Sequence, residues 1–367
     1  MFLQITPEGP DLSAAQARQL DDEFFQANPR GYFSARIGSL MELLERDGDV
    51  NLENPWPGLR MSPEASIAYT KSDQSLQLAA DAFAVRHHAA EALVRLLHAL
   101  IVPSSRSDAP STWALITDGP TTLHVACAEL MDVLNAKGNE SLLASRLFPN
   151  GTKVTDEVQR AFGTAVAWLN HATHLLTSDG LEVNAANNKM KHGLAVRMRN
   201  DVRIELMVGL QPRGDGTVPL SAFGVGKSIP IFDRPMLTYL SRPHPAKKNG
   251  LETSSLRVDV PLVLAEAWMI SLYYGAFFHV AAAAHFTAGE ERPTIAPYPT
   301  MPLSPTPDEL LGNVPLGYRG VVTTPPGGGV PRESGLFFHG MFQQMTIDIE
   351  GKTSAVIVDD DAPNPTE

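Results

Sequence analysis

One apolar run constrains the fold of this chain more than any other feature. Residues 267–284 read AWMISLYYGAFFHVAAAA and contain no acid or base other than His279. This length approaches the roughly 20 apolar residues of a membrane-spanning helix. However, Glu266 adjoins the run, Ser271 interrupts it, and neither flank carries the Lys/Arg cluster that would orient a membrane span. We therefore expect a buried central helix in a soluble core and do not expect membrane insertion.

The composition supports a large packed core in one or two domains. The chain has 367 residues, 43% of them apolar, and 41 acidic residues exceed 29 Lys and Arg residues to give a net charge of −12. These values exclude a disordered, collagenous or disulfide-scaffold protein. The negative charge argues against a protein that coats nucleic acid or anionic membrane with its whole surface. Cys127, the single cysteine, can form no internal disulfide, and the first residues, MFLQITP, lack a secretory signal, so we expect the protein in the cytoplasm.

Helical periodicity dominates the first 200 residues. Ser62, followed by Pro63 and Glu64, is typical of a helix start, and Thr155 is a good N-cap for a later helix. A break near 71–74 would divide the longest helix in two. The expected helices cover residues 13–27, 34–45, 62–101, 121–136, 155–177, 181–198 and, through the apolar run, 261–288.

Strand-like alternation replaces this periodicity after residue 200. The sequence predicts strands at 201–208, 229–240 and 256–260 and a closing β-hairpin that pairs 342–350 with 353–358. Between them, residues 293–331 hold ten of the 29 prolines, which indicates an extended arm or linker without regular structure.

These patterns predict an α+β fold that is mainly α: a bundle of five or six helices with a small inserted antiparallel sheet and an irregular, proline-rich C-terminal arm. Strands that follow a run of helices, rather than alternating with them, disfavour a doubly wound parallel sheet. The expected organisation is an N-terminal segment (1–61), a helical core (62–290) with its sheet at about 201–260, a proline/glycine-rich arm (291–335), the hairpin (336–358) and an acidic tail (359–367).

The most unusual local segment is 184–203, NAANNKMKHGLAVRMRNDVR. On a helix, Asn184, Asn188 and His192 form one row on the side opposite an apolar stripe through Met190. We therefore expect the His192 ring to face away from the core, beside two carboxamides.

The same segment is basic within an acidic chain. Residues 185–203 contain five Lys or Arg and one acid, Asp201. A basic island of this kind is a candidate site for an anionic ligand. Alternatively, it is a solvated helix end with Gly193 as the residue that terminates the helix. The candidate ligand-binding residues are Lys189, Lys191, Arg197 and Arg199.

The run Asn187-Asn188-Lys189-Met190-Lys191-His192-Gly193 resembles an Asn-Lys-x-Lys-His-Gly segment of some bacterial helical proteins and, more loosely, the HEPN superfamily. HEPN domains are helical bundles, and many of them bind or cut RNA through an arginine placed a few residues before a histidine. In this chain Asn187 stands in the place of that arginine. The resemblance implies His192, Asn187 and Asn188 as catalytic residues, lysines as the cations, and a homodimer.

Ribonuclease chemistry of that kind needs no metal. A histidine removes the proton of the ribose 2′-hydroxyl, and a nearby cation stabilises the phosphorane. The sequence thus favours a protein that binds RNA or another phosphate-bearing ligand, with nuclease activity as an open question and no cofactor or metal.

Two other functions stay open. In the first, the protein is a non-catalytic oligomer of the shell, capsid or scaffold type, in which the apolar helix and the proline-rich arm make subunit contacts. In the second, histidine pairs such as His171 and His174 bind a metal within a bundle enzyme, although no spacing completes a ligand set.

Overall fold

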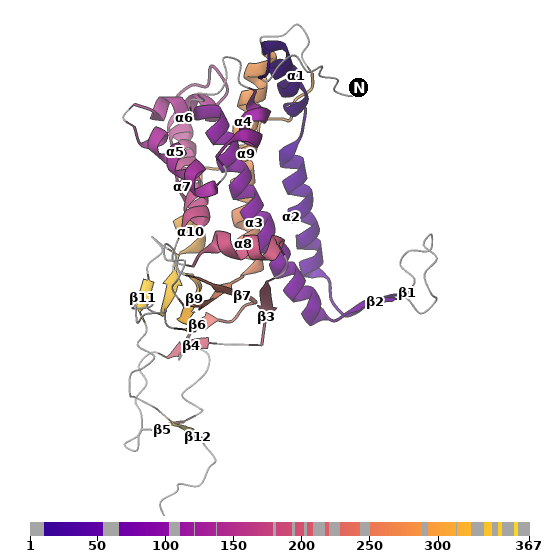
Figure 1. The fold of residues 1–367 in the computed structure, drawn as a ribbon, viewed down its shortest axis with the longest axis vertical. Helices are drawn as coiled ribbons and strands as arrows, with labels where there is room; N and C mark the ends of the chain where they lie inside the picture. Colours follow the sequence, from indigo (N-terminus) through magenta and orange to yellow (C-terminus); the bar gives the residue numbers. More distant parts are fainter. Residues whose placement is uncertain are drawn as a thin grey trace, which may run out of the picture.

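The computed structural model confirms an α+β fold that is mainly α-helical. It describes residues 11–53, 66–102, 111–120, 122–136, 138–178, 181–192, 195–201, 204–207, 217–219, 228–242, 250–287, 293–312, 314–323, 334–339, 344–346 and 356–358. Long helices form one layer and the main sheet forms another, with the short helix α8 lying across their junction (Figure 1).

Ten helices lie within the described residues. They are α1 (Ala14–Phe24), α2 (Pro29–Glu45), α3 (Lys71–Ile101), α4 (Thr112–Asp118), α5 (Leu123–Asn135), α6 (Glu140–Leu147), α7 (Asp156–Thr177), α8 (Val183–Lys191), α9 (Val260–Thr287) and α10 (Pro307–Leu311). The region 62–290 holds seven of them, α3 to α9, rather than the five or six predicted. The sequence does not predict α4 or α6, since both are short and α4 buries no residue in the core.

The main sheet has six antiparallel strands in the order β11-β10-β9-β8-β7-β3. These strands are β3 (Val196–Arg199), β7 (Met236–Ser241), β8 (Glu252–Arg257), β9 (Pro315–Val321), β10 (Gly335–Phe338) and β11 (Gln344–Thr346). In the part of the chain that the structure describes, three two-stranded pairs accompany it. They join β1 (Val50–Glu53) to β2 (Ser66–Tyr69), β4 (Ile204–Met207) to β6 (Ser228–Phe232), and β5 (Thr217–Pro219) to β12 (Val356–Val358).

The proline-rich region contributes regular structure, contrary to the predicted arm over 291–335. Strand β9 lies inside the main sheet between β8 and β10, and α10 packs against α7 and α9. Prolines flank these elements more than they interrupt them, because Pro307 is at the first position of α10 and Pro315 at the first position of β9. The sheet therefore extends well beyond the predicted range of 201–260.

The predicted hairpin between 342–350 and 353–358 is also wrong. Strand β11 pairs with β10, and β12 pairs in parallel with β5. The predicted strand over 229–240 divides into β6 and β7, with Pro235 between them. The acidic tail, 359–367, lies outside the described residues.

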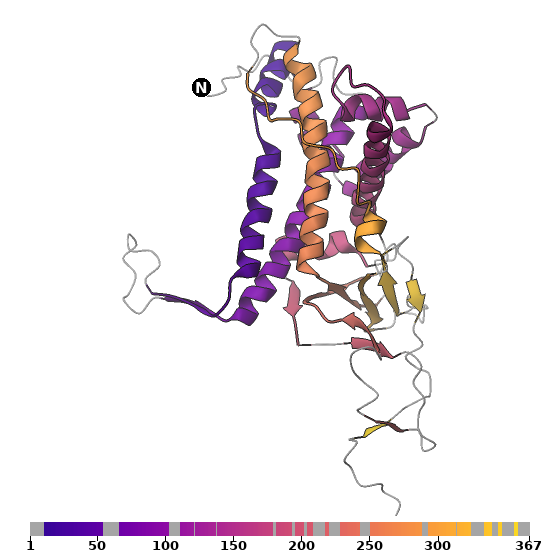
Figure 2. The same ribbon diagram turned by 180° about the vertical axis from the view of Figure 1, so that it is seen from behind.

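Helix α3 begins later than its sequence pattern indicates. Thr70 forms a capping box with Asp73, in which each side chain bonds the backbone N–H of the other residue. Residues 66–69 form β2, so helix over that stretch is excluded, while the predicted start at 62–64 lies outside the described residues. Strands β1 and β2 form a ribbon that projects away from the helical layer (Figures 1 and 2).

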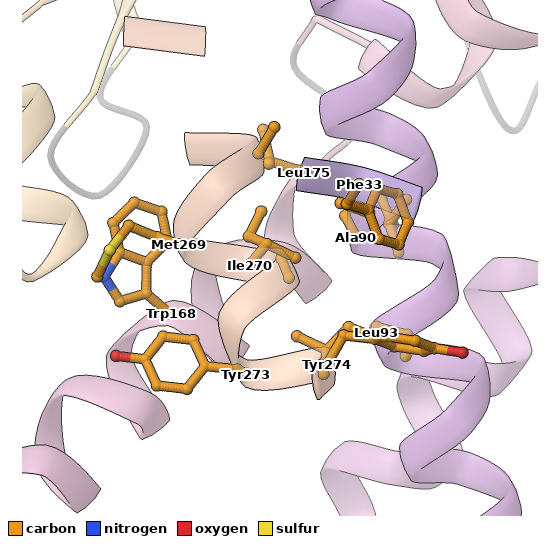
Figure 3. Packing of buried hydrophobic residues seen from close by; sticks show 14 of the residues in the cluster. Phe33, Ala90, Leu93, Trp168, Leu175, Met269, Ile270, Tyr273 and Tyr274 are labelled. Atoms are coloured by element: carbon orange, nitrogen blue, oxygen red, sulfur yellow. The ribbon is translucent and has the colours of Figure 1, made fainter. Parts of the chain in front are cut away.

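The apolar run forms α9, as predicted, and α9 is a central core helix. It is long and apolar enough to cross a membrane by length and composition, but its most apolar window is 78% buried inside the fold. Figure 3 shows Met269 and Tyr273 on the side of Trp168 from α7, while Tyr274 lies with Phe33 and Leu93 from α2 and α3. Helices pack against α9 on several sides, which explains why its sequence has no polar face.

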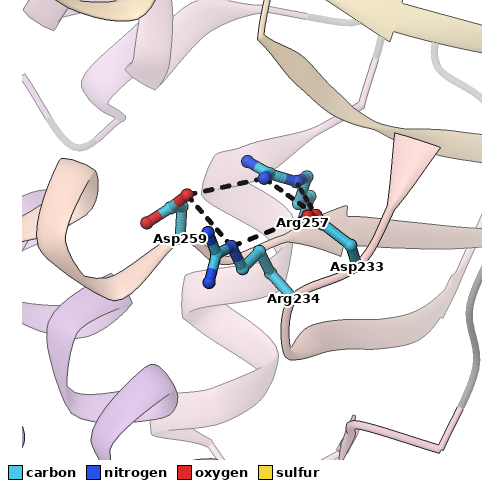
Figure 4. A network of polar contacts seen from close by, with 4 residues as sticks. All are labelled: Asp233, Arg234, Arg257 and Asp259. Carbon is cyan, nitrogen blue, oxygen red and sulfur yellow. Dashed lines mark hydrogen bonds and ion pairs between the residues drawn. The ribbon is translucent and has the colours of Figure 1, made fainter. Parts of the chain in front are cut away.

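An ion-pair network fixes the sheet to the start of α9 (Figure 4). Arg257 Nη2 lies 2.9 Å from Asp233 Oδ1 and 3.4 Å from Asp259 Oδ2. Arg234 Nε lies 3.4 Å from the same Asp259 oxygen and 3.9 Å from Asp233 Oδ2. Two acids and two bases thus join the β6–β7 turn, the end of β8 and the residue that directly precedes α9.

Candidate functional site

Helix α8 carries the segment that the sequence singles out. It starts after Glu182, whose backbone is left-handed (φ 47°), and it ends at Lys191. His192 is the C-cap residue and donates its backbone N–H to the Asn188 carbonyl at 2.9 Å. The His192 side chain is exposed, so it faces away from the core as predicted.

The predicted helix over 181–198 is too long at its C-terminal end. Residues 196–199 form β3, an edge strand on which Val196 and Met198 pack against the hydrophobic core. Val196 and Met198 are two residues apart, so a strand places both on the same face, whereas a helix would place them on nearly opposite faces. Gly193, the alternative end of the helix, lies outside the described residues.

The asparagines of α8 point in different directions. Asn188 is exposed, as is His192, but Asn184 reaches His87 of α3, with Asn184 Oδ1 and His87 Nε2 at 3.2 Å. Asn187 is 1% exposed, and its Oδ1 and Nδ2 have no hydrogen-bond partner among the described residues. The structure therefore does not bring Asn187 together with the exposed His192 ring.

Lys191 lies against α3. Its Nζ is 3.4 Å from Glu91 Oε2, and its side chain is 49% exposed. Lys189, two positions earlier, is half-buried. Lys191 is thus the candidate base that α8 places beside other titratable groups.

Arg197 and Arg199 occupy the other face of β3. They alternate with the two core-facing residues of that strand. Arg199 makes a bidentate ion pair with Asp201, at 2.7 and 2.9 Å, and the charge of Arg197 also lowers the pKa of Asp201. Both arginines therefore act on a local acid, Asp201, whereas the ion pair described for Lys191 is with Glu91.

Three residues that the sequence did not connect with α8 complete the surface around Lys191. Arg36 of α2 places Nη1 at 3.5 Å from His88 Nδ1 of α3 and at 3.1 Å from the hydroxyl of Tyr32. Tyr32 is 48% exposed, and His88 is exposed as well. We call Tyr32, Arg36, His88, Glu91 and Lys191 the α2–α3–α8 face.

The surroundings of His88 hold its pKa below the ordinary value for histidine. Partial burial lowers the pKa of His88 first, and the charges of Arg36 and Lys191 lower it further. Partial burial alone would raise the pKa of Glu91, but hydrogen bonds and charges from Arg95 and Lys191 outweigh it and leave that pKa below its ordinary value. The face thus combines two cations, one carboxylate and a neutral imidazole that can accept a proton.

A second polar group lies inside the molecule, and we call it the buried cluster: Arg86, His171, Glu266 and His339. Arg86 Nη1 donates to Glu266 Oε1 at 3.0 Å, and His171 Nε2 donates to Glu266 Oε2 at 2.8 Å. His339 Nε2 lies 3.4 Å from His171 Nδ1. The cluster joins α3, α7, α9 and the end of β10, and each of its residues is less than 10% exposed.

Mutual contacts set the charges in the buried cluster. Burial would raise the pKa of Glu266, but the Arg86 guanidinium and the His171 ring hold it well below the usual range. Burial, and after it the charge of His171, lower the pKa of His339 to about 4. Because Glu266 already has both oxygens engaged, the cluster is a structural connection rather than an open site.

The described residues contain no group of three or more His, Cys, Asp or Glu side chains that could hold a metal ion. The predicted pair of His171 and His174 illustrates the reason. His171 uses Nε2 for Glu266 and turns Nδ1 towards His339, so its nitrogens face protein groups rather than a shared metal position.

The sequence indicates only some of the residues of the α2–α3–α8 face. His88 and Glu91 are visible as polar positions on an otherwise buried helix, whereas Arg36 looks like any base on a surface helix. Comparisons of the chain with protein-family models, curated proteins and solved structures found no match. A function therefore has to be inferred from the chemistry of the site.

Proposed function

We propose that the α2–α3–α8 face binds RNA or another phosphate-bearing ligand. The observation that carries the proposal is that two bases act on an exposed histidine, His88: Arg36 Nη1 lies 3.5 Å from His88 Nδ1, and the charges of Arg36 and Lys191 both lower the pKa of His88. Guanidinium and ammonium groups bind phosphate oxygens, and the exposed Tyr32 ring offers a surface on which a base can stack. The resemblance of the α8 segment to HEPN proteins supports the same ligand class.

Cleavage of the bound RNA is the enzymatic form of this proposal. It needs a group that takes the 2′-hydroxyl proton and a cation beside the phosphorane. His192 is the candidate from the sequence, and His88 is the candidate from the structure, since Arg36 Nη1 lies 3.5 Å from its ring and the charge of Lys191 also acts on it. Gel analysis of a labelled RNA in EDTA, with His88→Ala and His192→Ala compared, assigns the role to one of them or limits the function to binding.

Salt dependence of RNA binding tests the proposal directly. We expect Arg36→Ala/Lys191→Ala to weaken binding of a fluorescein-labelled 20-nucleotide single-stranded RNA in anisotropy titrations. Each lost phosphate contact removes about 0.7 from the slope of log K against log salt, so two contacts should remove about 1.4.

The matched control is Arg18→Ala/Lys153→Ala, which removes two exposed bases on α1 and before α7. It should leave the slope unchanged. Equal losses in both double variants would mean that RNA binding is not localised at the α2–α3–α8 face.

A homo-oligomer with structural contacts is the second candidate. The projecting ribbon of β1 and β2 favours it, because a two-stranded ribbon away from the body offers unpaired strand edges (Figure 2). Light scattering should then give an oligomer, and a glycine-serine bridge in place of residues 50–69 should shift the protein to monomer.

A further inference from the structure

A pocket of about 370 Å³ lies where α2, β2 and the first turns of α3 meet. Leu43, Tyr69 and Leu78 provide apolar walls, and four polar residues of α3 complete the lining: Asp73, Gln74, Gln77 and Asp81. This volume falls in the range of sites for small molecules. The pocket is separate from the α2–α3–α8 face, since the two share no residue.

The polar lining offers hydrogen-bond acceptors. Gln74 is 7% exposed, its Nε2 donates to the Leu43 carbonyl at 3.0 Å, and its Oε1 has no partner among the described residues. The bond to Leu43 fixes the amide through its nitrogen, and the oxygen of this pocket-lining residue stays buried without a donor among the described residues. A buried carbonyl oxygen without a donor costs free energy, which a ligand N–H group would recover.

Two carboxylates flank that amide. Asp73 accepts bonds from Thr70 and Asp81 accepts one from Gln77, and these bonds engage the Oδ2 atom of each carboxylate. No described residue forms an ion pair with Asp73 or Asp81. Lys71, the base nearest to Asp73 in sequence, is directed instead to Asp47, at 3.5 Å.

The spacing of the two aspartates along α3 indicates the length of a matching ligand. Asp73 and Asp81 are eight residues apart on one helix, which is a rise of roughly 12 Å. An extended aliphatic triamine has about this length, with ammonium groups at its ends and methylene groups between them. Such a chain would place its methylenes on Leu43 and Leu78 and an N–H group at Gln74 Oε1.

We propose that this pocket binds a linear aliphatic polyamine. The ammonium groups pair with Asp73 and Asp81, and the apolar wall selects an alkyl chain over a hydrated metal ion of similar charge. The site is independent of RNA binding at the α2–α3–α8 face.

Isothermal titration calorimetry with spermidine tests the proposal on the full chain. We expect one site per chain, little competition by an equal concentration of Mg²⁺, and at least about tenfold weaker binding to Asp81→Asn, which removes a charge-assisted bond. Gln74→Met, which keeps the side-chain length but removes the acceptor, should weaken binding as well.

Asp132→Asn is the matched control, since Asp132 is exposed on α5 and does not line the pocket. It should bind spermidine as the parent protein does. Equal affinity of Asp81→Asn and Asp132→Asn, displacement by Mg²⁺ at equal concentration, or no heat of binding in the parent protein would overturn the proposal. Circular dichroism establishes that each variant is folded, and Asp81→Asn is at a half-exposed position where folding should persist.

Discussion

Helix α3 contributes residues to both the buried cluster and the α2–α3–α8 face. Both groups combine a base, a histidine and a glutamate, and their α3 residues lie within two helical turns, but the two groups have different roles. In the buried cluster, the side chains of Arg86 and Glu266 are 9% and 5% exposed, and each carboxylate oxygen has a donor. On the α2–α3–α8 face, the side chains of Lys191 and Glu91 are 49% and 21% exposed and lie 3.4 Å apart. Burial fixes the first set in place, while solvent access leaves the second set free to exchange its partners for a ligand.

The largest expected difference between the two regions is in the free energy of unfolding, which Glu266→Gln should lower most. The variant leaves the Arg86 charge buried without its carboxylate, and breaking one side of a buried pair costs about 3–5 kcal/mol of unfolding free energy. Urea denaturation measures this loss. The matched variant, Glu91→Gln, should cost less, about 1 kcal/mol, because its ion pairs are partly exposed to water.

A double variant tests whether an unpaired buried charge causes the loss of stability. Arg86→Met/Glu266→Met removes both charges and should be more stable than Glu266→Gln, since no unpaired charge remains. If Glu266→Gln were no less stable than Glu91→Gln, the buried cluster would not be the connection between helices that we describe.

The second effect is a loss of stability in mild acid. Burial and the charge of His171 lower the pKa of His339 from 6.5 to about 4, so the unfolded chain binds this proton more tightly than the folded protein. The stability linked to neutral His339 is complete above pH 6.5 and is lost as the pH falls towards 4. We expect His339→Gln to reduce the fall in urea midpoint between pH 7 and pH 4.5.

His124→Gln is the control for this titration, because His124 is exposed on α5. It should keep the pH dependence of the parent protein. Glu266 does not obscure the measurement, since its pKa is lowered from 4.5 and its contribution is lost only at more acidic pH. An unchanged pH dependence in His339→Gln would contradict a neutral, buried His339.

Local sequence patterns predicted the long helices well. The bounds of α7 and α9 agree with the predictions to within one or two residues, because capping at Thr155 and a continuous apolar run are properties of adjacent residues. The start of α3 was missed because Thr70 and Asp73 form a capping box inside a longer apolar pattern. The position of β9 could not be read from a proline-rich segment, since its partners are strands far away in the chain.

Local sequence patterns could not predict which residues meet in the buried cluster or on the α2–α3–α8 face, because the partners lie far apart in the chain. Arg86 and Glu266 are 180 residues apart, and Arg36 and His88 are 52 residues apart. Nothing in the periodicity of either helix indicates which partner the fold will supply. Of the candidate site, the sequence predicted Lys191 and the outward direction of His192, whereas Asn187 lies in the interior.

The smallest expected effect is a change in RNA affinity at the α2–α3–α8 face, where Glu91 and phosphate compete for the same bases. Glu91 pairs with both Lys191 and Arg95 and therefore competes with phosphate for those bases. We expect Glu91→Gln to tighten binding of the labelled single-stranded RNA by about two- to fivefold at low salt and to lose that advantage at high salt, where exposed charges are screened. Glu129→Gln, a half-exposed acid whose partner is His98, is the control and should leave the affinity unchanged. Tighter binding that persists at high salt, or equal gains in both variants, would show that Glu91 does not compete locally and that its removal acts only through the net charge of the protein.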